Sequence, residues 1–229
     1  MTDSADISTE VLVIGGGPAG AAAGYWLARH GHDVTVVERK TFPRDKTCGD
    51  GLTPRAVHQL EEMGLGEQLQ KYHRYSGLRA TGMGRELELE WPSHPVYPSH
   101  GYVVRRRELD QMVAENAAAA GATLLTGHEA LEPVVERGFV RGATVLNKKG
   151  EHRTISARYV VVADGANSRF GRALGTFRTR EWPYGTAIRT YWQTPRHQDP
   201  WIESALDVKD RNGNPMPGYG WIFPVGDGT

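Results

Sequence analysis

The sequence contains a single cysteine, Cys48, among its 229 residues. A lone cysteine excludes an internal disulfide, so its role is packing or thiol chemistry. It also argues against a disulfide-stapled scaffold and favours a reducing compartment. Basic residues are not in excess either, because Lys plus Arg and Asp plus Glu number 27 each, which gives a formal net charge of zero. Nothing in this balance indicates a nucleic-acid partner.

One stretch, residues 11–28, carries no charge and has about the length of a membrane span. A glycine cluster from Gly15 to Gly20 interrupts it, which is typical of a strand, a tight turn and a helix. Before this stretch lie the acidic residues Asp3, Asp6 and Glu10, so the basic start of a signal peptide is missing. The sequence therefore predicts a cytoplasmic protein without a membrane-spanning helix.

The first part of the chain is typical of a βαβ unit. A continuous apolar strand is expected at Glu10–Ile14 and an alanine-rich helix at Pro18–His30, ended by Gly31. A second strand is expected at Asp33–Glu38. Such a unit predicts a parallel sheet with helices on its faces.

The remaining pattern predicts a mixture of helices and strands that becomes β-rich from Thr186 onward. The expected elements are a helix at Pro54–Met63 with Thr53 as its cap, one alternating strand at Leu78–Trp91, a helix at Arg106–Ala120, a strand at Ala122–Leu125, a meander at Glu129–Glu136, Val140–Asn147 and His152–Ser156, a buried strand at Tyr159–Ala163, a helix at Ser168–Leu174 and a strand at Tyr219–Val225.

A dinucleotide-binding fingerprint lies at the first strand-to-helix turn. Gly15, Gly17 and Gly20 have the spacing G-x-G-x-x-G, which permits a tight turn and the close approach of a pyrophosphate to the helix N-terminus. Glu38, at the end of the next strand, can accept hydrogen bonds from ribose hydroxyls and favours NAD or FAD over NADP. The alternative is a glycine-rich turn that binds no ligand.

Two distant features favour FAD. Arg106 begins the second alanine-rich helix, and Asp164 with Gly165 follows the apolar strand at Tyr159–Ala163. Here the chain resembles the hydroxylase-like flavoprotein superfamily, in which such an Asp-Gly segment closes off the FAD-binding sheet. Two plainer interpretations stay open: a solvated arginine at the helix start, and a strand-to-helix turn capped by Ser168.

Two further stretches resemble the geranylgeranyl reductase family of FAD-dependent oxidoreductases. Pro43–Leu52 is similar to the family's active-site loop, P-x-x-x-x-C-G-x-G, and Pro217–Gly226 is similar to its substrate motif, Y-x-W-x-F-P-x-G. The resemblance covers most of the chain and is strongest to the actinobacterial branch that saturates one isoprene unit of menaquinone. It implies reduction of a C=C bond in a menaquinone side chain or a geranylgeranyl lipid, by hydride from reduced flavin. The external reductant, NADPH, ferredoxin or another donor, stays open.

The resemblance also implies which residues bind, and it implies no metal. The FAD contacts are Gly15, Gly17, Ala19, Gly20, Glu38, Arg39, Cys48, Gly49, Gly51, Arg106, Ala130 and Asp164, with Ala130 beside the adenine, and the substrate contacts are Tyr219, Trp221, Phe223 and Pro224. Cys48 is the catalytic candidate. A thiol is a weak acid, so protonating an unactivated alkene is a hard task for it. General acid, wall of the flavin and lipid cavity, and buried packing residue all stay open.

The implied fold is α/β: a Rossmann-like FAD-binding domain, made of a parallel sheet and a β-meander, with a β-rich substrate domain. The expected boundaries are 1–74 with 101–178 for the first and 75–100 with 179–229 for the second. Family members carry a later G-D-A segment that contacts the flavin, so we expect a truncated, N-terminal portion.

Other functions remain open at this point. Alternatives are a flavin-dependent halogenase or aromatic monooxygenase of the same fold, and a truncated, non-catalytic remnant of an FAD-binding module that binds FAD weakly or not at all. A lipid substrate would also bring peripheral contact with the inner face of the cell membrane.

Overall fold

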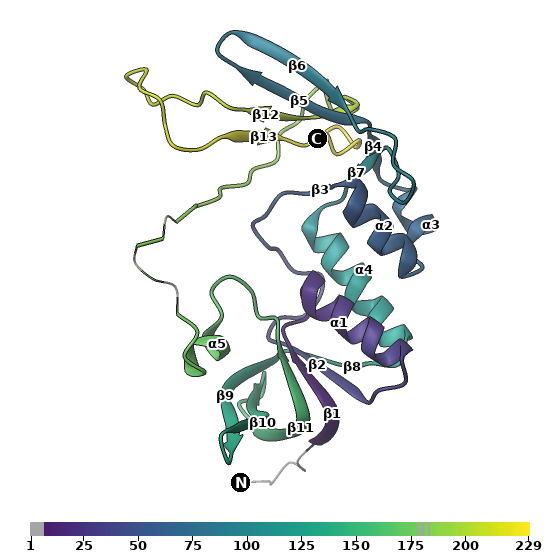
Figure 1. Cartoon of the computed structure of the whole chain (residues 1–229), viewed down its shortest axis with the longest axis vertical. Helices are drawn as coiled ribbons and strands as arrows, with labels where there is room; N and C mark the ends of the chain where they lie inside the picture. Colours follow the sequence, from purple (N-terminus) through teal and green to yellow (C-terminus); the bar gives the residue numbers. More distant parts are fainter. Residues whose placement is uncertain (1–6, 178, 180, 183) are drawn as a thin grey trace. The chain divides into compact units, whose positions relative to one another are not determined.

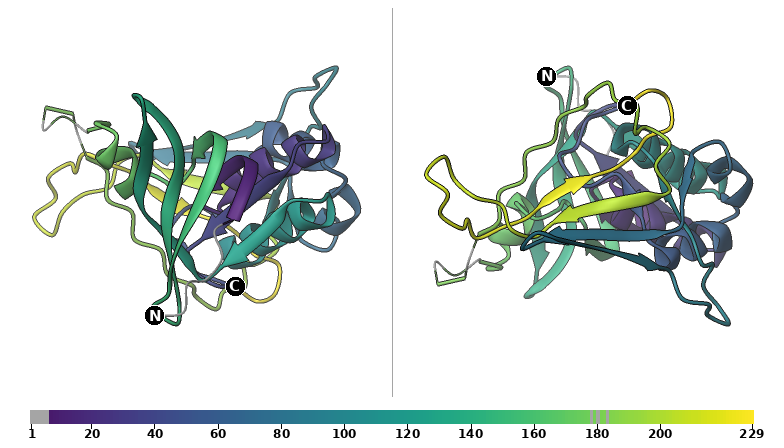
Figure 2. Two further views of the ribbon diagram at one scale, coloured as in Figure 1. Left: turned by 90° about the horizontal axis from the view of Figure 1, so that it is seen from below. Right: turned by 90° about the horizontal axis from the view of Figure 1, so that it is seen from above.

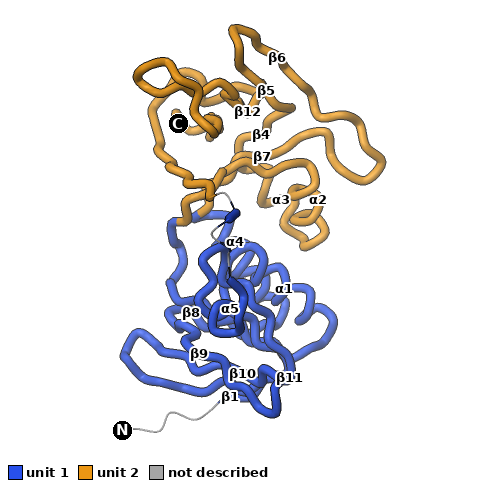
Figure 3. The backbone as a smooth tube through the Cα atoms, turned by 60° about the vertical axis from the view of Figure 1, so that its left-hand side comes forward, with its two compact units in different colours: residues 1–45, 107–183 blue, residues 46–106, 184–229 orange. Residues whose placement is uncertain are grey.

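A computed structural model describes residues 7–177, 179, 181–182 and 184–229. The chain forms two compact units (Figure 3): unit 1 contains residues 1–45 and 107–183, and unit 2 contains residues 46–106 and 184–229. Each unit is therefore assembled from two separate stretches of sequence. The functional domain boundaries expected above stay a prediction, and residue 178, at one of them, lies outside the described residues.

Unit 1 is built on a six-stranded mixed sheet, counted over the described residues. Its order is β8 (Thr123–Thr126), β2 (Val34–Glu38), β1 (Ile7–Ile14), β11 (His152–Val162), β10 (Phe139–Asn147) and β9 (His128–Glu136). The strands β8, β2, β1 and β11 are parallel, whereas β10 is antiparallel to both of its neighbours. Figure 2 shows β9, β10 and β11 as long strands side by side. The predicted parallel sheet with a β-meander is confirmed.

The apolar run in β1 and β2 is explained by burial on both faces. On one face, Leu12 and Ile14 belong to a buried cluster with Phe170. On the other face, a helix packs so closely that a Cβ added to its Gly24 would lie 2.8 Å from Cγ2 of Val36. Figure 1 shows the two helices on that side, α1 (Pro18–Arg29) and α4 (Arg106–Ala119).

Unit 2 contains two small sheets and two short helices. Their order is β13 (Gly220–Ile222), β12 (Trp201–Ala205), β5 (Gly77–Gly82) and β6 (Arg85–Glu90) in one sheet, and β3 (Gly51–Leu52), β7 (Gly101–Val103) and β4 (His73–Tyr75) in the other, with α2 (Pro54–Glu62) and α3 (Gly66–Leu69). Tyr75, Val103 and Ile202 are buried together in its core. The hydroxyl of Tyr75 donates to the carbonyl oxygen of Leu52 at 2.9 Å, so this buried phenol is satisfied.

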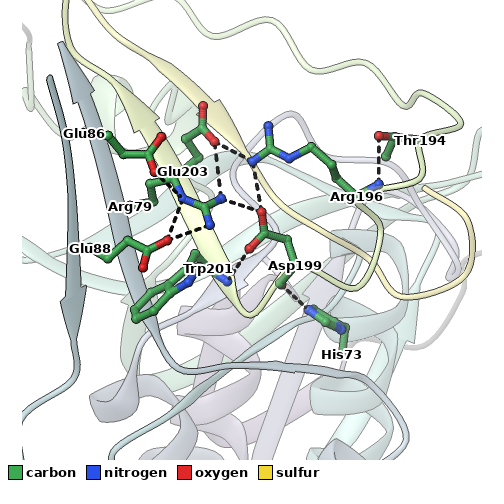
Figure 4. Close-up of polar contacts among 9 residues, drawn as sticks. All are labelled: His73, Arg79, Glu86, Glu88, Thr194, Arg196, Asp199, Trp201 and Glu203. Carbon is green, nitrogen blue, oxygen red and sulfur yellow. Dashed lines mark hydrogen bonds and ion pairs between the residues drawn. The ribbon is translucent and has the colours of Figure 1, made fainter. Parts of the chain in front are cut away.

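A network of ion pairs covers one face of the larger sheet of unit 2 (Figure 4). Arg79 on β5 donates to Glu88 on β6, at 2.8 Å, and to Asp199, which precedes β12. Arg196 adds bonds to Asp199 and to Glu203, at 3.0 and 2.6 Å. Burial raises the pKa of the Asp199 carboxyl, but the hydrogen bonds from Arg79 and Arg196 outweigh burial and lower it below its ordinary value. The network therefore ties β12 to β5, a parallel neighbour distant in sequence.

Three predicted strands differ from the structure. The strand expected at Leu78–Trp91 is a hairpin of β5 and β6, because Met83 and Gly84 both adopt positive φ in a two-residue turn. The strands expected at His152–Ser156 and Tyr159–Ala163 are one continuous strand, β11, whose register with β1 runs through this region. Its second half is also less buried than predicted, since Tyr159 is 55% exposed.

Smaller differences concern element ends and caps. Thr53 precedes α2 as predicted, but its side chain makes no capping hydrogen bond, whereas the Ser168 hydroxyl accepts a bond from the backbone N–H of Gly171 as a cap should. The strand expected at Tyr219–Val225 is confined to β13, since Pro224 cannot donate to a ladder. Within the described residues, the β-rich region expected from Thr186 contains only β12 and β13 as strands.

None of the helices in the described part of the chain combines the length and the apolar character that crossing a bilayer requires.

Candidate functional site

The glycine fingerprint forms a tight turn between β1 and α1 in unit 1. Gly15 adopts a positive φ of 100°, and a Cβ there would lie 2.5 Å from the carbonyl oxygen of Ala163. A Cβ on Gly20 would overlap the carbonyl oxygen of Gly15. Gly17 is the N-cap of α1, and Ala19 is exposed in its first turn. The spacing therefore brings the start of α1, with its unpaired N–H groups, directly onto the end of β1.

The Glu38 carboxylate lies beside this turn at the end of β2. It is 6% exposed, and its two oxygens accept backbone hydrogen bonds from Gly16 and Lys40, each at 3.0 Å. A carboxylate offers about four acceptor positions, so capacity remains for a ribose hydroxyl. Arg39, the next residue, is exposed.

Arg44 forms a buried ion network that the sequence did not indicate. Its guanidinium lies 2.9 Å from Oδ2 of Asp110 and 3.4 Å from Oε2 of Glu38. Asp110, on α4, is fully buried. The available signal was a charged residue on the buried face of a predicted helix, which requires a partner of opposite charge. Arg44 contacts Oε2 of Glu38, the same oxygen that accepts from the backbone of Gly16, so the network helps to fix the carboxylate beside the turn.

Asp164 follows β11 and lies next to the glycine turn. Its Oδ2 accepts from the backbone of Arg169 and Phe170, at 3.0 and 3.3 Å, at the start of α5 (Arg169–Ala173). Its Oδ1 is buried and, within the described part of the chain, has no hydrogen-bond partner. A buried acceptor without a donor is costly, and a ligand hydroxyl or a water would satisfy it. Together with the glycine turn, this unpartnered oxygen fits a dinucleotide.

Ala130, expected beside the adenine, lies on β9 opposite Val145 of β10. It is partly buried and packs against the core cluster of unit 1. The structure thus gives Ala130 a packing role, and its contact with a cofactor stays a prediction.

Residues 46–52 of the Cys48 loop belong to unit 2, whereas residues 43–45 belong to unit 1. Cys48 itself is exposed, so the interpretation as a buried packing residue does not hold for this structure. The ring of Phe223 packs against two glycines of this loop. A Cβ added to Gly49 would lie 3.1 Å from that ring, and one added to Gly51 would lie 2.7 Å from it. The loop motif and the aromatic motif, distant in sequence, are therefore in contact. The absent side chains at Gly49 and Gly51 make room for Phe223.

The aromatic motif presents alternate rings along β13 and the residues that flank it. Tyr219 and Trp221 meet edge to face with ring centroids 5.5 Å apart, and Trp221 stacks on Phe223 at 5.6 Å. Tyr219 is 61% exposed and Trp221 43% exposed, whereas Phe223 packs against the core of unit 2. Pro224 is buried. The motif is therefore partly core and partly an exposed apolar surface.

Arg106 and Asp50 meet at the base of the loop. The backbone N–H of Arg106 donates to Oδ1 of Asp50 at 3.0 Å, and Asp50 is only 3% exposed. Sequence reasoning selected Arg106 for its side chain and missed Asp50, which lies between two motif glycines with no distinctive spacing of its own.

The expected site residues are thus divided between the two units. Unit 1 contains Gly15, Gly17, Ala19, Gly20, Glu38, Arg39, Ala130 and Asp164, and unit 2 contains Cys48, Gly49, Gly51, Arg106, Tyr219, Trp221, Phe223 and Pro224.

Known proteins similar to this chain include reductases. The chain is 46% identical to the menaquinone reductase of Mycobacterium tuberculosis over 225 residues, which are 98% of this chain and 54% of the relative. It therefore spans about half the length of the curated relatives it matches. Among solved structures it is similar to a geranylgeranyl bacteriochlorophyll reductase-like protein from Thermoplasma acidophilum, with a TM-score of 0.75 and 24% identity, over 98% of this chain and 55% of the other.

A myxobacterial chondrochloren halogenase is similar to a comparable degree, with a TM-score of 0.77 and 23% identity, over 96% of this chain and 51% of the halogenase. Identities this low establish the fold alone. The sequence also matches the FAD binding domain family over residues 8–212. Because this match spans most of the chain, the protein belongs to the FAD binding domain family, whose cofactor is FAD.

Proposed function

We propose that this chain is part of an FAD-dependent reductase that saturates a C=C bond of an isoprenoid chain, with the menaquinone side chain as its substrate. The contact of Phe223 with Gly49 and Gly51 carries the proposal, because it joins the two motifs that resemble the geranylgeranyl reductases. The 46% identity to a menaquinone reductase supports the same substrate class.

The described residues suit such a reaction. Reduced FAD, when bound, supplies a hydride from its flavin ring. Gly15, Glu38 and Asp164 would hold the dinucleotide, with the unpartnered Oδ1 of Asp164 accepting from a hydroxyl of the cofactor. The exposed faces of Tyr219 and Trp221 supply the apolar surface that an isoprenoid chain requires.

Mass spectrometry of menaquinone tests the substrate. Incubated with chemically reduced FAD and the product of the complete reading frame of this gene, menaquinone is expected to gain two hydrogens. The same mixture without protein is the control. An oxygen or halogen adduct would instead support the monooxygenase or halogenase alternative. A colourless protein that releases no FAD on denaturation would support the non-catalytic remnant.

The role of Cys48 is tested by Cys48→Ala in the same assay. We propose that Cys48 lines the reacting site and does not donate the proton, since a thiol is a weak acid for an alkene carbon. Turnover is then expected to stay within about tenfold of the parent, whereas removal of a general acid costs about 10²–10⁴-fold. Thr47→Ala, at the neighbouring exposed position, is the matched control.

A lipid substrate also brings peripheral contact with the membrane that contains it, as part of this proposal. No segment is assigned to this contact. Its support is the substrate class alone, and the measurement is co-sedimentation with lipid vesicles that contain menaquinone, compared with vesicles that do not. Protein that stays in the supernatant with both vesicle types would contradict it.

A further inference from the structure

Asp50 is the centre of a polar cluster in unit 2 that the proposed chemistry does not use. Its carboxylate is 3% exposed, so its charge requires partners. Oδ1 accepts from Arg189 at 3.1 Å as well as from the backbone of Arg106. Oδ2 accepts from the hydroxyl of Tyr191 at 2.8 Å. The backbone carbonyl of Asp50 accepts from Val104 at 2.8 Å. This one residue therefore gathers donors from two distant stretches of the chain.

Arg189 extends the cluster into the Cys48 loop. The same Nη1 that bonds Asp50 lies 2.9 Å from the carbonyl oxygen of Lys46 and 3.5 Å from that of Cys48. Nη1 carries two N–H donors, so its three acceptors share them, with the carbonyl oxygen of Cys48 as the most distant of the three. One side chain thus bonds the loop at Lys46, at Cys48 and at Asp50. The segment that contributes it, residues 184–194, has no strand of its own.

Tyr191 holds Arg189 in place. The guanidinium carbons of Arg189 and Arg105 lie over its ring, at 5.1 and 5.2 Å from the centroid. Burial, followed by the hydrogen bond to Asp50, raises the pKa of the Tyr191 phenol to about 12. The hydroxyl is therefore protonated at neutral pH and is a donor to the Asp50 carboxylate.

We propose that Arg189, together with Asp50 and Tyr191, is a positioning residue that sets the conformation of the Cys48 loop. These three residues are called the Asp50 clamp. The inference rests on the proposed function only in taking this loop as part of the reacting site. The bonds from Arg189 to the loop backbone fix where the Cys48 thiol lies, while the ring of Phe223 covers the adjacent glycines.

Proteolysis after lysine measures the order of the loop. An endoprotease that cuts only after lysine has one site inside the loop, at Lys46, and another in the same unit at exposed Lys71, which is the internal reference. In Arg189→Gln, cleavage after Lys46 is expected to become about ten- to a hundredfold faster, as for the loss of a charged hydrogen bond that limits local opening. Cleavage after Lys71 is expected to stay unchanged.

Further variants separate positioning from general stability. Asp50→Asn is expected to have the same effect, and the double variant no more than either single one, because the two residues act as one unit. Arg211→Gln, on an exposed turn of the same unit, is the matched control and should change neither site. Equal acceleration at Lys46 and Lys71, or none at Lys46, would overturn the proposal. Should Arg189→Gln not fold, Tyr191→Phe removes a single oxygen and carries the same test, with a rise at Lys46 alone.

A nitroxide on Cys48 gives a second, spectroscopic measurement. Because the chain has no other cysteine, the label reports this loop alone. Its lines are expected to narrow in Arg189→Gln and to match the parent in Arg211→Gln, and unchanged lines would contradict a clamp. These measurements do not depend on catalysis. A loosened loop in a protein that adds no hydrogen to menaquinone would keep the Asp50 clamp and overturn the proposed substrate instead.

Discussion

An Arg44→Met variant is expected to lose about 3–5 kcal/mol of the unfolding free energy of unit 1, the usual cost of breaking a buried ion pair by removing one partner. The Arg44 side chain is 11% exposed and lies between Asp110, at 0%, and Glu38, at 8%. Methionine keeps an apolar stem but leaves both carboxylates without their cation. Hydrogen exchange of peptides from β1, α1 and α4 measures the loss locally.

Two comparisons show whether the charge is the cause. Arg39→Met removes an exposed arginine nearby and should stay within about 0.5 kcal/mol of the parent. Asp110→Asn, added to Arg44→Met, should recover part of the loss because it removes a fully buried charge that no longer has its arginine. A loss below about 1 kcal/mol in Arg44→Met would show that the pairs contribute no more than surface pairs do.

Gly20→Ala is the second large effect. The new Cβ would overlap the backbone carbonyl oxygen of Gly15. Because this oxygen belongs to the backbone, it cannot move aside as the end of a flexible side chain can. We expect a destabilisation of at least about 3 kcal/mol, at the upper end of overpacking costs. Because the same turn fits the dinucleotide, FAD binding should be lost with it. Hydrogen exchange of residues 7–29 and a titration with FAD measure the two effects.

Gly17→Ala, three positions earlier, is the matched control. The atom nearest to its Cβ is Nη2 of Arg44 at 3.4 Å, an ordinary contact with the end of a flexible side chain. At an N-cap, alanine is less favourable than glycine, and a loss of about 1 kcal/mol is expected, well below that of Gly20→Ala. If both variants lost the same stability, crowding at Gly20 would not be the cause.

The contrast between these two positions shows what the sequence could predict. Gly15, Gly17 and Gly20 follow a buried strand and open a helix, and this local order predicted the βαβ unit and its turn correctly. The same reasoning failed at Met83, where a turn of only two residues separates β5 from β6. A turn with positive φ at both positions has a weak signal when only one of them is glycine.

Contacts between distant residues were beyond local reasoning. Arg44 pairs with Asp110, and Asp50 pairs with Arg189. Each pair joins segments that lie far apart in the sequence, so no helical or strand periodicity relates the two residues. Resemblance to a family placed the Cys48 loop and the aromatic strand in one site, and the packing of Phe223 on Gly51 gives that association a physical basis. It could not indicate the arginine that holds the loop, because neither motif contains it.

The interleaving of the two units has a consequence during synthesis. Among the described strands, β1 comes first in the sequence. Its Ile7 pairs with Ile155 of β11, and Gly77 of β5 in unit 2 pairs with Trp201 of β12, so both pairings require residues that are translated much later. Pairing between such distant segments is slow, because the loop must close before the contacts stabilise it. A nascent chain would therefore leave the ribosome with β1 paired to β2 along one edge and unpaired along the other, and such an open strand edge is the kind of surface that chaperones shield. The same connectivity that lets both units share one chain makes each of them dependent on residues translated long after its first strand.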